Sequence, residues 1–108
     1  MLKTTEIFIY KYEGKTMRVE FEKNMNRSAL YDEHDKLVGE STFSPSDTIW
    51  IIEHTSVDGA LRGHGYASKL IEKIVENARN ENVKIIPLCP YAKREFEKNP
   101  EYNNMLFK

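Results

Sequence analysis

The sequence has few of the features that mark secreted, zinc-bound or membrane-spanning proteins. Its 108 residues include one cysteine, Cys89, so no disulfide can form within the chain and no thiolate cluster is available for zinc. No apolar stretch approaches the roughly 20 residues of a membrane-spanning helix. The segment from Met1 to Glu6 lacks the apolar run of a secretory signal peptide. We therefore expect a single domain, residues 1–108, in the reducing cytoplasm, with no metal site.

An excess of charge of one sign is also absent. The chain carries 16 Lys and Arg residues against 17 Asp and Glu residues, which gives a formal net charge of −1. This balance gives no reason to expect nucleic acid or an anionic membrane as the main partner. A chain of this length buries a modest core, which leaves room for one sheet and a few helices.

The first half of the chain shows the patterns of β-strands. Met17, Val19 and Phe21 alternate with charged residues, which is typical of a half-buried strand. The near-continuous apolar run that begins at Ile49 predicts a central strand covered on both faces. Polar turns separate the segments, so we expect an antiparallel meander that opens with a hairpin. The predicted strands are residues 7–12, 17–22, 28–32, 37–43 and 48–57.

The second half changes to helical periodicity. Apolar residues recur every three or four positions from Gly65 to about Asn82, which predicts an amphipathic helix. Residues 83–87 predict a short strand, parallel to the strand before the helix because a crossover helix connects the two. A second helix is predicted over residues 90–98, followed by a last packing segment. The fold class is therefore α/β (α+β): a mixed sheet with an antiparallel N-terminal meander, one β-α-β crossover and a short C-terminal helix.

A glycine-containing loop lies between the strongest strand and the long helix. Its sequence from Leu61 to Ser68 is LRGHGYAS. Backbone amides of such a loop, together with the positive N-terminal end of the helix, can hold a phosphate group. The loop lacks the lysine and hydroxyl residue of a Walker A motif, and Ser68 stands where a dinucleotide-binding loop has its third glycine or alanine. A tight turn without a ligand is the alternative interpretation.

Three side chains outside the loop could take part in chemistry. Cys89 precedes Pro90, a residue favoured at the first position of a helix, so the helix N-terminus would stabilise its thiolate. His54 could act as a general base near neutral pH, and Tyr91 could donate a proton. The structural alternatives are a buried inert cysteine, a hydrogen-bonded strand histidine and a packing aromatic.

Three segments together resemble a known family. The segment Arg62–Ala67, RGHGYA, looks like the Arg/Gln-x-x-Gly-x-Gly/Ala motif of the GNAT N-acetyltransferase superfamily. The segments His54–Val57 (HTSV) and Cys89–Tyr91 (CPY) are similar to those of its minimal subfamily of about 100 residues, which has a His-Thr-x-Val segment before the loop and a cysteine after the next strand. The match runs from about Asn26 to the end of the chain.

The resemblance implies a GNAT-like fold that binds acetyl-CoA or CoA where two parallel strands splay apart. The loop amides would hold the pyrophosphate, and the strand near Val57 would pair with the pantetheine arm. The cofactor-binding residues implied in this way are Val57, Arg62, Gly63, His64, Gly65, Tyr66 and Ala67. For the 3′-phosphate of CoA, the basic candidates are Lys69, Lys73, Lys93 and Arg94.

The implied activity is transfer of an acetyl group to an unidentified small-molecule or peptide amine. In direct transfer, His54 would take the proton of the amine, and Cys89 or Tyr91 would protonate the leaving thiolate. In a covalent route, the Cys89 thiolate would accept the acetyl group first. A larger GNAT enzyme has a helical region that shapes the amine pocket, and this chain has no room for it.

The sequence is also compatible with two other functions. The chain could be a CoA-binding module with little or no catalysis, which the lack of room for acceptor-site helices favours. It could also be a small α/β domain without a ligand. Exposed strands in the first half could pair between chains, so a homodimer is one expected assembly.

Overall fold

The computed structural model describes residues 7–12 and 14–108. The segment from Met1 to Glu6 and residue 13 of the predicted first turn lie outside these residues. The elements follow in the order β1 (Ile7–Tyr12), β2 (Lys15–Glu22), β3 (Arg27–Tyr31), β4 (Leu37–Ser44), β5 (Ile49–Val57), α1 (Tyr66–Asn80), β6 (Lys84–Pro87) and α2 (Pro90–Lys98). Short 3-10 helices occupy Lys23–Met25, Gly59–Leu61 and Pro100–Met105.

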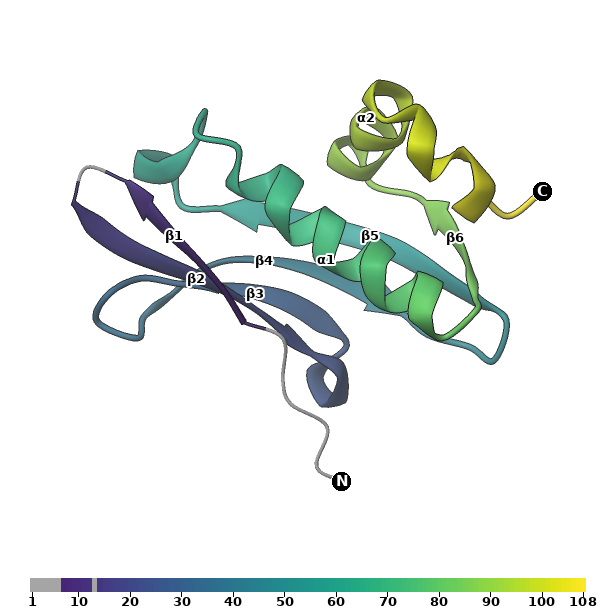
Figure 1. Cartoon of the computed structure of the whole chain (residues 1–108), viewed down its shortest axis with the longest axis horizontal. Helices are drawn as coiled ribbons and strands as arrows, with labels where there is room; N and C mark the ends of the chain where they lie inside the picture. The colour runs from purple at the N-terminus through teal and green to yellow at the C-terminus, as the bar shows by residue number, and fades with distance from the viewer. Residues whose placement is uncertain (1–6, 13) are drawn as a thin grey trace.

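The six strands form one mixed sheet in which spatial order equals chain order (Figure 1). The first five strands pair antiparallel with their chain neighbours. β6 pairs parallel to β5, from Ile49 opposite Lys84 to Ile52 opposite Pro87, after the crossover through α1. These pairings confirm the predicted fold class: a meander, one β-α-β unit and a short C-terminal helix.

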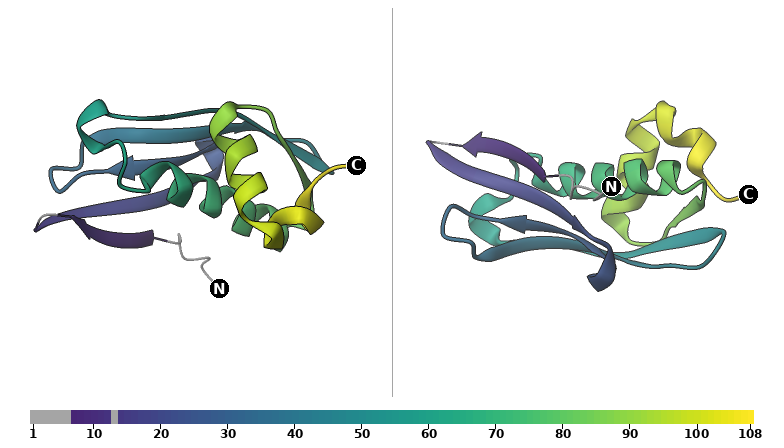
Figure 2. Two further views of the ribbon diagram at one scale, coloured as in Figure 1. Left: turned by 90° about the horizontal axis from the view of Figure 1, so that it is seen from above. Right: turned by 60° about the horizontal axis from the view of Figure 1, so that its bottom comes forward.

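The sheet is curled, and α1 lies in its hollow between the β1–β2 hairpin and α2 (Figure 2). The apolar stripe of α1 divides the core into two clusters. Towards the N-terminus of the helix, Leu70 packs with Met17 and Val19 of β2. Towards its C-terminus, Ile74 packs with Trp50 and with residues of α2. The hairpin is therefore part of the folded core, because its buried side chains lie against the same helix.

The prediction that β5 is covered on both faces is wrong. Trp50, Ile52, Thr55 and Val57 are buried, whereas Glu53, His54 and Ser56 are exposed. The helices lie on one face of the sheet, and the other face carries charged side chains. The strength of the apolar run at residues 49–52 comes from half-buried Ile49 and Ile51, not from a second covering layer.

A β-bulge changes the alternation of β5. Thr42 of β4 faces His54, but the next residue, Phe43, faces Ile52, so Glu53 is an extra residue. Before the bulge, Ile52 points towards α1. After it, Thr55 and Val57 point the same way, because the inserted residue shifts the period of two by one position.

Neither α1 nor α2, the two α-helices of the described residues, combines the length and apolar character needed to cross a bilayer. The expected homodimer stays a prediction. β1 and β6 are the two edges of the sheet, and the exposed Ile9 lies on β1.

Candidate functional site

Two glycines set the path of the loop between β5 and α1. Gly63 and Gly65 have φ values of +83° and +82°, a conformation that side-chain-bearing residues rarely adopt. Gly65 is the N-cap of α1, and it has no side chain that could cap this helix end. A Cβ atom added to either glycine would meet nothing within 4 Å, so both residues border open space. The first N–H groups of α1 therefore remain available to an anion.

This helix end opens on a cavity of about 290 Å³. The cavity lies between the glycine loop, the first turn of α1 and the exposed side of α2. Its lining residues are Val57, Leu61, Arg62, Gly63, Gly65, Tyr66, Ala67, Ser68, Tyr91, Arg94, Glu95 and Lys98. Six of the seven predicted cofactor-binding residues are in this set. His64, the seventh, is exposed and does not line the cavity.

The cavity forms where two parallel strands part. Pairing between β5 and β6 ends with Ile52 opposite Pro87, whereas β5 continues to Val57. The backbone N–H groups of Leu88 and Cys89 both donate to the Ile52 carbonyl, and the chain then turns into α2. β5 therefore extends alone past this point, and its last residue reaches the cavity.

Three basic side chains line the cavity. Arg62 donates through Nε to the Val57 carbonyl at 3.3 Å, and Arg94 and Lys98 come from successive turns of α2. Of the four basic residues predicted for the 3′-phosphate, Arg94 is the one that lines the cavity. The sequence interpretation missed Lys98, although its spacing of four residues from Arg94 places both on one helix face.

The two lysines predicted from α1 have other surroundings. Lys73 is 2% exposed and its Nζ lies 3.3 Å from an Oε2 oxygen of Glu76. The Lys69 ammonium lies 5.3 Å from the centre of the Tyr10 ring. Lys69 therefore faces the N-terminal hairpin, and neither lysine is among the residues that line the cavity.

A buried carboxylate joins the two helices at the cavity wall. Glu95 of α2 is 8% exposed. One of its oxygens accepts a hydrogen bond from Ser68 Oγ at 2.6 Å and lies 3.2 Å from Lys98 Nζ. The other accepts from Asn99 Nδ2 at 3.3 Å. These donors offset the cost of burying the charge, and they fix the first turn of α1 against α2.

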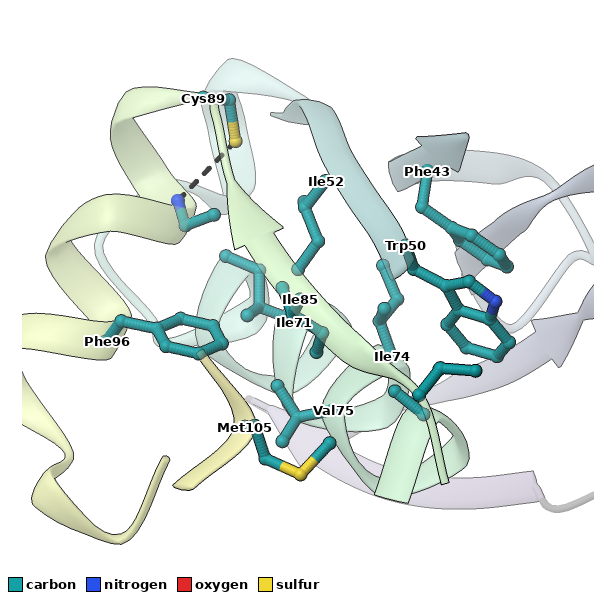
Figure 3. Close-up of a cluster of buried hydrophobic side chains, with 13 residues drawn as sticks. Phe43, Trp50, Ile52, Ile71, Ile74, Val75, Ile85, Cys89, Phe96 and Met105 are labelled. Atoms are coloured by element: carbon teal, nitrogen blue, oxygen red, sulfur yellow. Dashed lines mark hydrogen bonds between the residues drawn. The ribbon is translucent and has the colours of Figure 1, made fainter. Parts of the chain in front are cut away.

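Cys89 is the N-cap of α2, as the sequence predicts. Its Sγ accepts a hydrogen bond from the Ala92 N–H at 3.4 Å (Figure 3). The Oγ1 of Thr55 lies 3.4 Å from the same sulfur. Cys89 is 6% exposed, and it is not among the described residues that line the cavity. The sulfur points towards the core beside Ile52.

The structure places the other two predicted catalytic residues apart from each other. Tyr91 lines the cavity and is 39% exposed. His54 is exposed on the uncovered face of the sheet, opposite to the face on which its neighbour Thr55 meets Cys89. Adjacent strand residues point to opposite faces, so His54 and Cys89 are not brought together.

Tyr66 is an ionisable residue of the cavity wall. Tyr66, the first residue of α1, is 5% exposed, and this desolvation raises the pKa of its phenol above the ordinary value.

Within residues 7–12 and 14–108, no three His, Cys, Asp or Glu side chains are grouped so that they could hold a metal ion.

Comparisons with known proteins agree on one family. A sequence model described as GCN5-related N-acetyl-transferase matches residues 27–105. The NMR solution structure of a GCN5-like protein from Staphylococcus aureus is similar to this chain, with a TM-score of 0.61 and 28% sequence identity over 93% of this chain and 87% of that chain. No curated protein matches the chain. The match over residues 27–105 spans more than half of the sequence, from β3 to the end of the last 3-10 helix, and the chain therefore belongs to the GCN5-related N-acetyltransferase family.

Proposed function

We propose that this protein binds acetyl-CoA in the cavity and transfers the acetyl group to an amine. The observation that carries the proposal is the uncapped N-terminus of α1, which opens on a cavity that also contains Arg94 and Lys98. Backbone donors and fixed positive charges are the groups that bind phosphates. CoA carries a pyrophosphate and a 3′-phosphate, so it matches both kinds of group.

The chemistry of the residues present suits the phosphate groups and the pantetheine arm of acetyl-CoA. The amides from Arg62 to Ala67 would hold the pyrophosphate, because the two glycines keep side chains away from this side of the loop. Arg94 and Lys98 would meet further phosphate charge. The unpaired end of β5 at Val57 would lie beside the pantetheine arm. When bound, acetyl-CoA would supply the activated acetyl thioester.

Tyr91 and Cys89 are the candidates for the proton-transfer or nucleophilic role. Tyr91, a residue of α2, borders the cavity. Cys89 is the N-cap of α2, and its sulfur has two hydrogen-bonding neighbours, the Thr55 hydroxyl and the Ala92 N–H. His54 could serve as a base only for an amine that approaches from the uncovered face of the sheet. These roles rest on the positions of the three residues.

Calorimetric titration with CoA tests the proposal. We expect wild-type protein to bind CoA, and Gly65→Ala to weaken binding by about tenfold, because a left-handed backbone costs an L side chain about 1–2 kcal/mol and the loop can relieve this strain only by moving its amides. Gly14→Ala is the matched control. Gly14 also has a positive φ, of +77°, but it lies in the turn between β1 and β2.

Turnover is tested separately, with acetyl-CoA and a panel of small amines and peptides. Release of free CoA thiol that depends on an amine supports the proposal. Tight CoA binding without turnover on any amine would indicate a CoA-binding module. Absence of both binding heat and thermal stabilisation by CoA would overturn both functions.

A further inference from the structure

Three hydroxyl side chains form a row across the covered face of the sheet. Ser28 of β3 faces Ser41 of β4, and Ser41 faces Thr55 of β5. Their exposed fractions are 0%, 0% and 6%. They lie directly across from one another on neighbouring strands, so their side chains share one face.

The row ends at the sulfur of Cys89. Ser41 Oγ lies 2.9 Å from Thr55 Oγ1, and Thr55 Oγ1 lies 3.4 Å from Cys89 Sγ. At the other end, the buried Ser28 Oγ has no hydrogen-bond partner among the described residues. From Ser28 to Cys89, polar atoms of β3, β4, β5 and the N-cap of α2 therefore follow one another across the covered face of the sheet.

Packing alone does not explain these residue types. The rows on either side are mainly apolar: Phe43 faces Ile52 on one side, and Leu30 lies in the row of Val57 on the other. A buried hydroxyl costs free energy unless it is fully hydrogen-bonded, and valine or alanine would fill the same places without that cost. Ser28 Oγ, which has no hydrogen-bond partner among the described residues, adds such a cost, so apolar packing alone does not account for the row.

The bulge at Glu53 is what brings Thr55 to the sulfur. Without the extra residue, the period of two from Ile52 would place His54 on the covered face and Thr55 in solvent. The structure therefore selects a hydroxyl, and not an imidazole, as the neighbour of Cys89.

We propose that Thr55, held by Ser41, is a positioning residue that donates a hydrogen bond to Cys89 and stabilises its thiolate form. A thiolate only accepts hydrogen bonds, so it would take one from the Ala92 N–H and one from the Thr55 hydroxyl. Thr55 is then left to accept from the Ser41 hydroxyl. This gives the row one direction, from Ser41 through Thr55 to the sulfur. The inference rests on the proposed function for its use in acetyl transfer.

The test measures the thiolate of Cys89 in the ligand-free protein. The ultraviolet absorbance of the thiolate is titrated with pH, and the Cys89→Ser protein serves as the blank for tyrosine ionisation. Thr55→Val keeps the shape and removes the hydroxyl. We expect the ratio of thiolate to thiol at a fixed pH to fall about tenfold, as for loss of one hydrogen bond to a charged group.

Three further variants separate the hydrogen bond from packing. Thr55→Ser keeps a hydroxyl, so its titration stays close to that of the wild type. Ser41→Ala lowers the thiolate fraction less than Thr55→Val, because it removes only the second hydroxyl, and it also serves if Thr55→Val does not fold. Thr42→Val is the matched control, since Thr42 faces His54 on the opposite face of the sheet.

The outcomes distinguish this inference from the proposed function. Equal titrations of Thr55→Val and Thr42→Val, or of Ser41→Ala and wild type where Thr55→Val does not fold, would overturn the positioning role while CoA binding and turnover stand. If the wild-type protein does not bind CoA, the proposed function is overturned, while the titration still reports on the hydroxyl row.

Discussion

At the scale of single residues, the bulge at Glu53 decides which side chains of β5 face the helices. The sequence singles out the segment from His54 to Val57 through its resemblance to the family, but strict alternation cannot show which of its members faces the helices. The extra residue appears only in the pairing of β4 with β5, where Thr42 and Phe43 face His54 and Ile52. The sequence interpretation therefore missed Thr55 and Ser41, because the contacts from Ser41 to Thr55 and from Thr55 to Cys89 join three elements.

Tyr102 contributes a predicted sensitivity of the fold to alkaline pH. Burial and the nearby carboxylates of Glu72 and Glu95 raise the pKa of Tyr102 from 10.0 to about 12. The folded state thus keeps this proton in a pH range where the unfolded chain loses it. The contribution is fully present below pH 10 and is lost as the pH rises towards about 12.

Tyr102→Phe tests this sensitivity. The ring contact with Phe96, at 5.2 Å between centroids, is kept in the variant. We expect the difference in melting temperature between variant and wild type to stay constant around neutral pH. Above pH 10, the melting temperature of the wild type should fall more steeply than that of the variant. Parallel melting curves up to pH 12 would contradict the assignment.

At the scale of elements, the cavity depends on how α1 and α2 are joined. Each helix was predicted from its own sequence pattern. The predicted bounds of α2, Pro90–Lys98, are those observed. The prediction for α1, which runs from Tyr66 to Asn80, extends two residues too far at the C-terminal end. Their contact through Ser68 and Glu95 could not be predicted, because a polar pair that is 27 residues apart in the chain leaves no periodic signal. The cavity wall is thus a product of packing between elements.

Ser68→Ala is expected to destabilise this junction. The substitution leaves the buried Glu95 carboxylate without its closest donor, which costs about 1–3 kcal/mol for a hydrogen bond to a charged group. Denaturant unfolding measures the change. Ser56→Ala, on the exposed side of β5, is the control and should fall within about 0.5 kcal/mol of the wild type.

A double-mutant cycle with Glu95→Gln isolates the pair. If Ser68 and Glu95 act together, the double variant loses less stability than the sum of the two single variants. Simple additivity would show that the hydrogen bond contributes nothing measurable and that Ser68 acts through packing alone.

At the scale of the whole molecule, the N-terminal hairpin is integrated with the family core. The family match begins at residue 27, after β1 and β2. Met17 of β2 is nevertheless 1% exposed, and it belongs to the same cluster as Leu70 and Tyr66 of α1. The first turn of α1, which borders the cavity, is therefore supported from the side of the hairpin.

Met17→Ala tests this integration. Loss of a buried methionine side chain is expected to cost about 2–5 kcal/mol, and the whole chain should still unfold in one transition. Ile9→Ala on β1 is the control, because Ile9 is 65% exposed and its truncation should change stability by no more than about 0.5 kcal/mol. A neutral Met17→Ala variant, or a separate transition for the hairpin, would contradict the integration of the hairpin with the core.

The sequence by itself determined the order of elements, the mixed sheet, the family and most of the cavity lining. These features depend on local periodicity, on the glycines that allow positive φ, and on the proline that follows Cys89, all of which act between residues close in the chain. The tertiary structure alone decided that β5 is covered on one face, that His54 and Cys89 lie on opposite sides, and that a row of hydroxyls reaches the sulfur. The physical reason is that a one-residue bulge reverses the facing of every later side chain in a strand, and the bulge is set by pairing with a neighbouring strand.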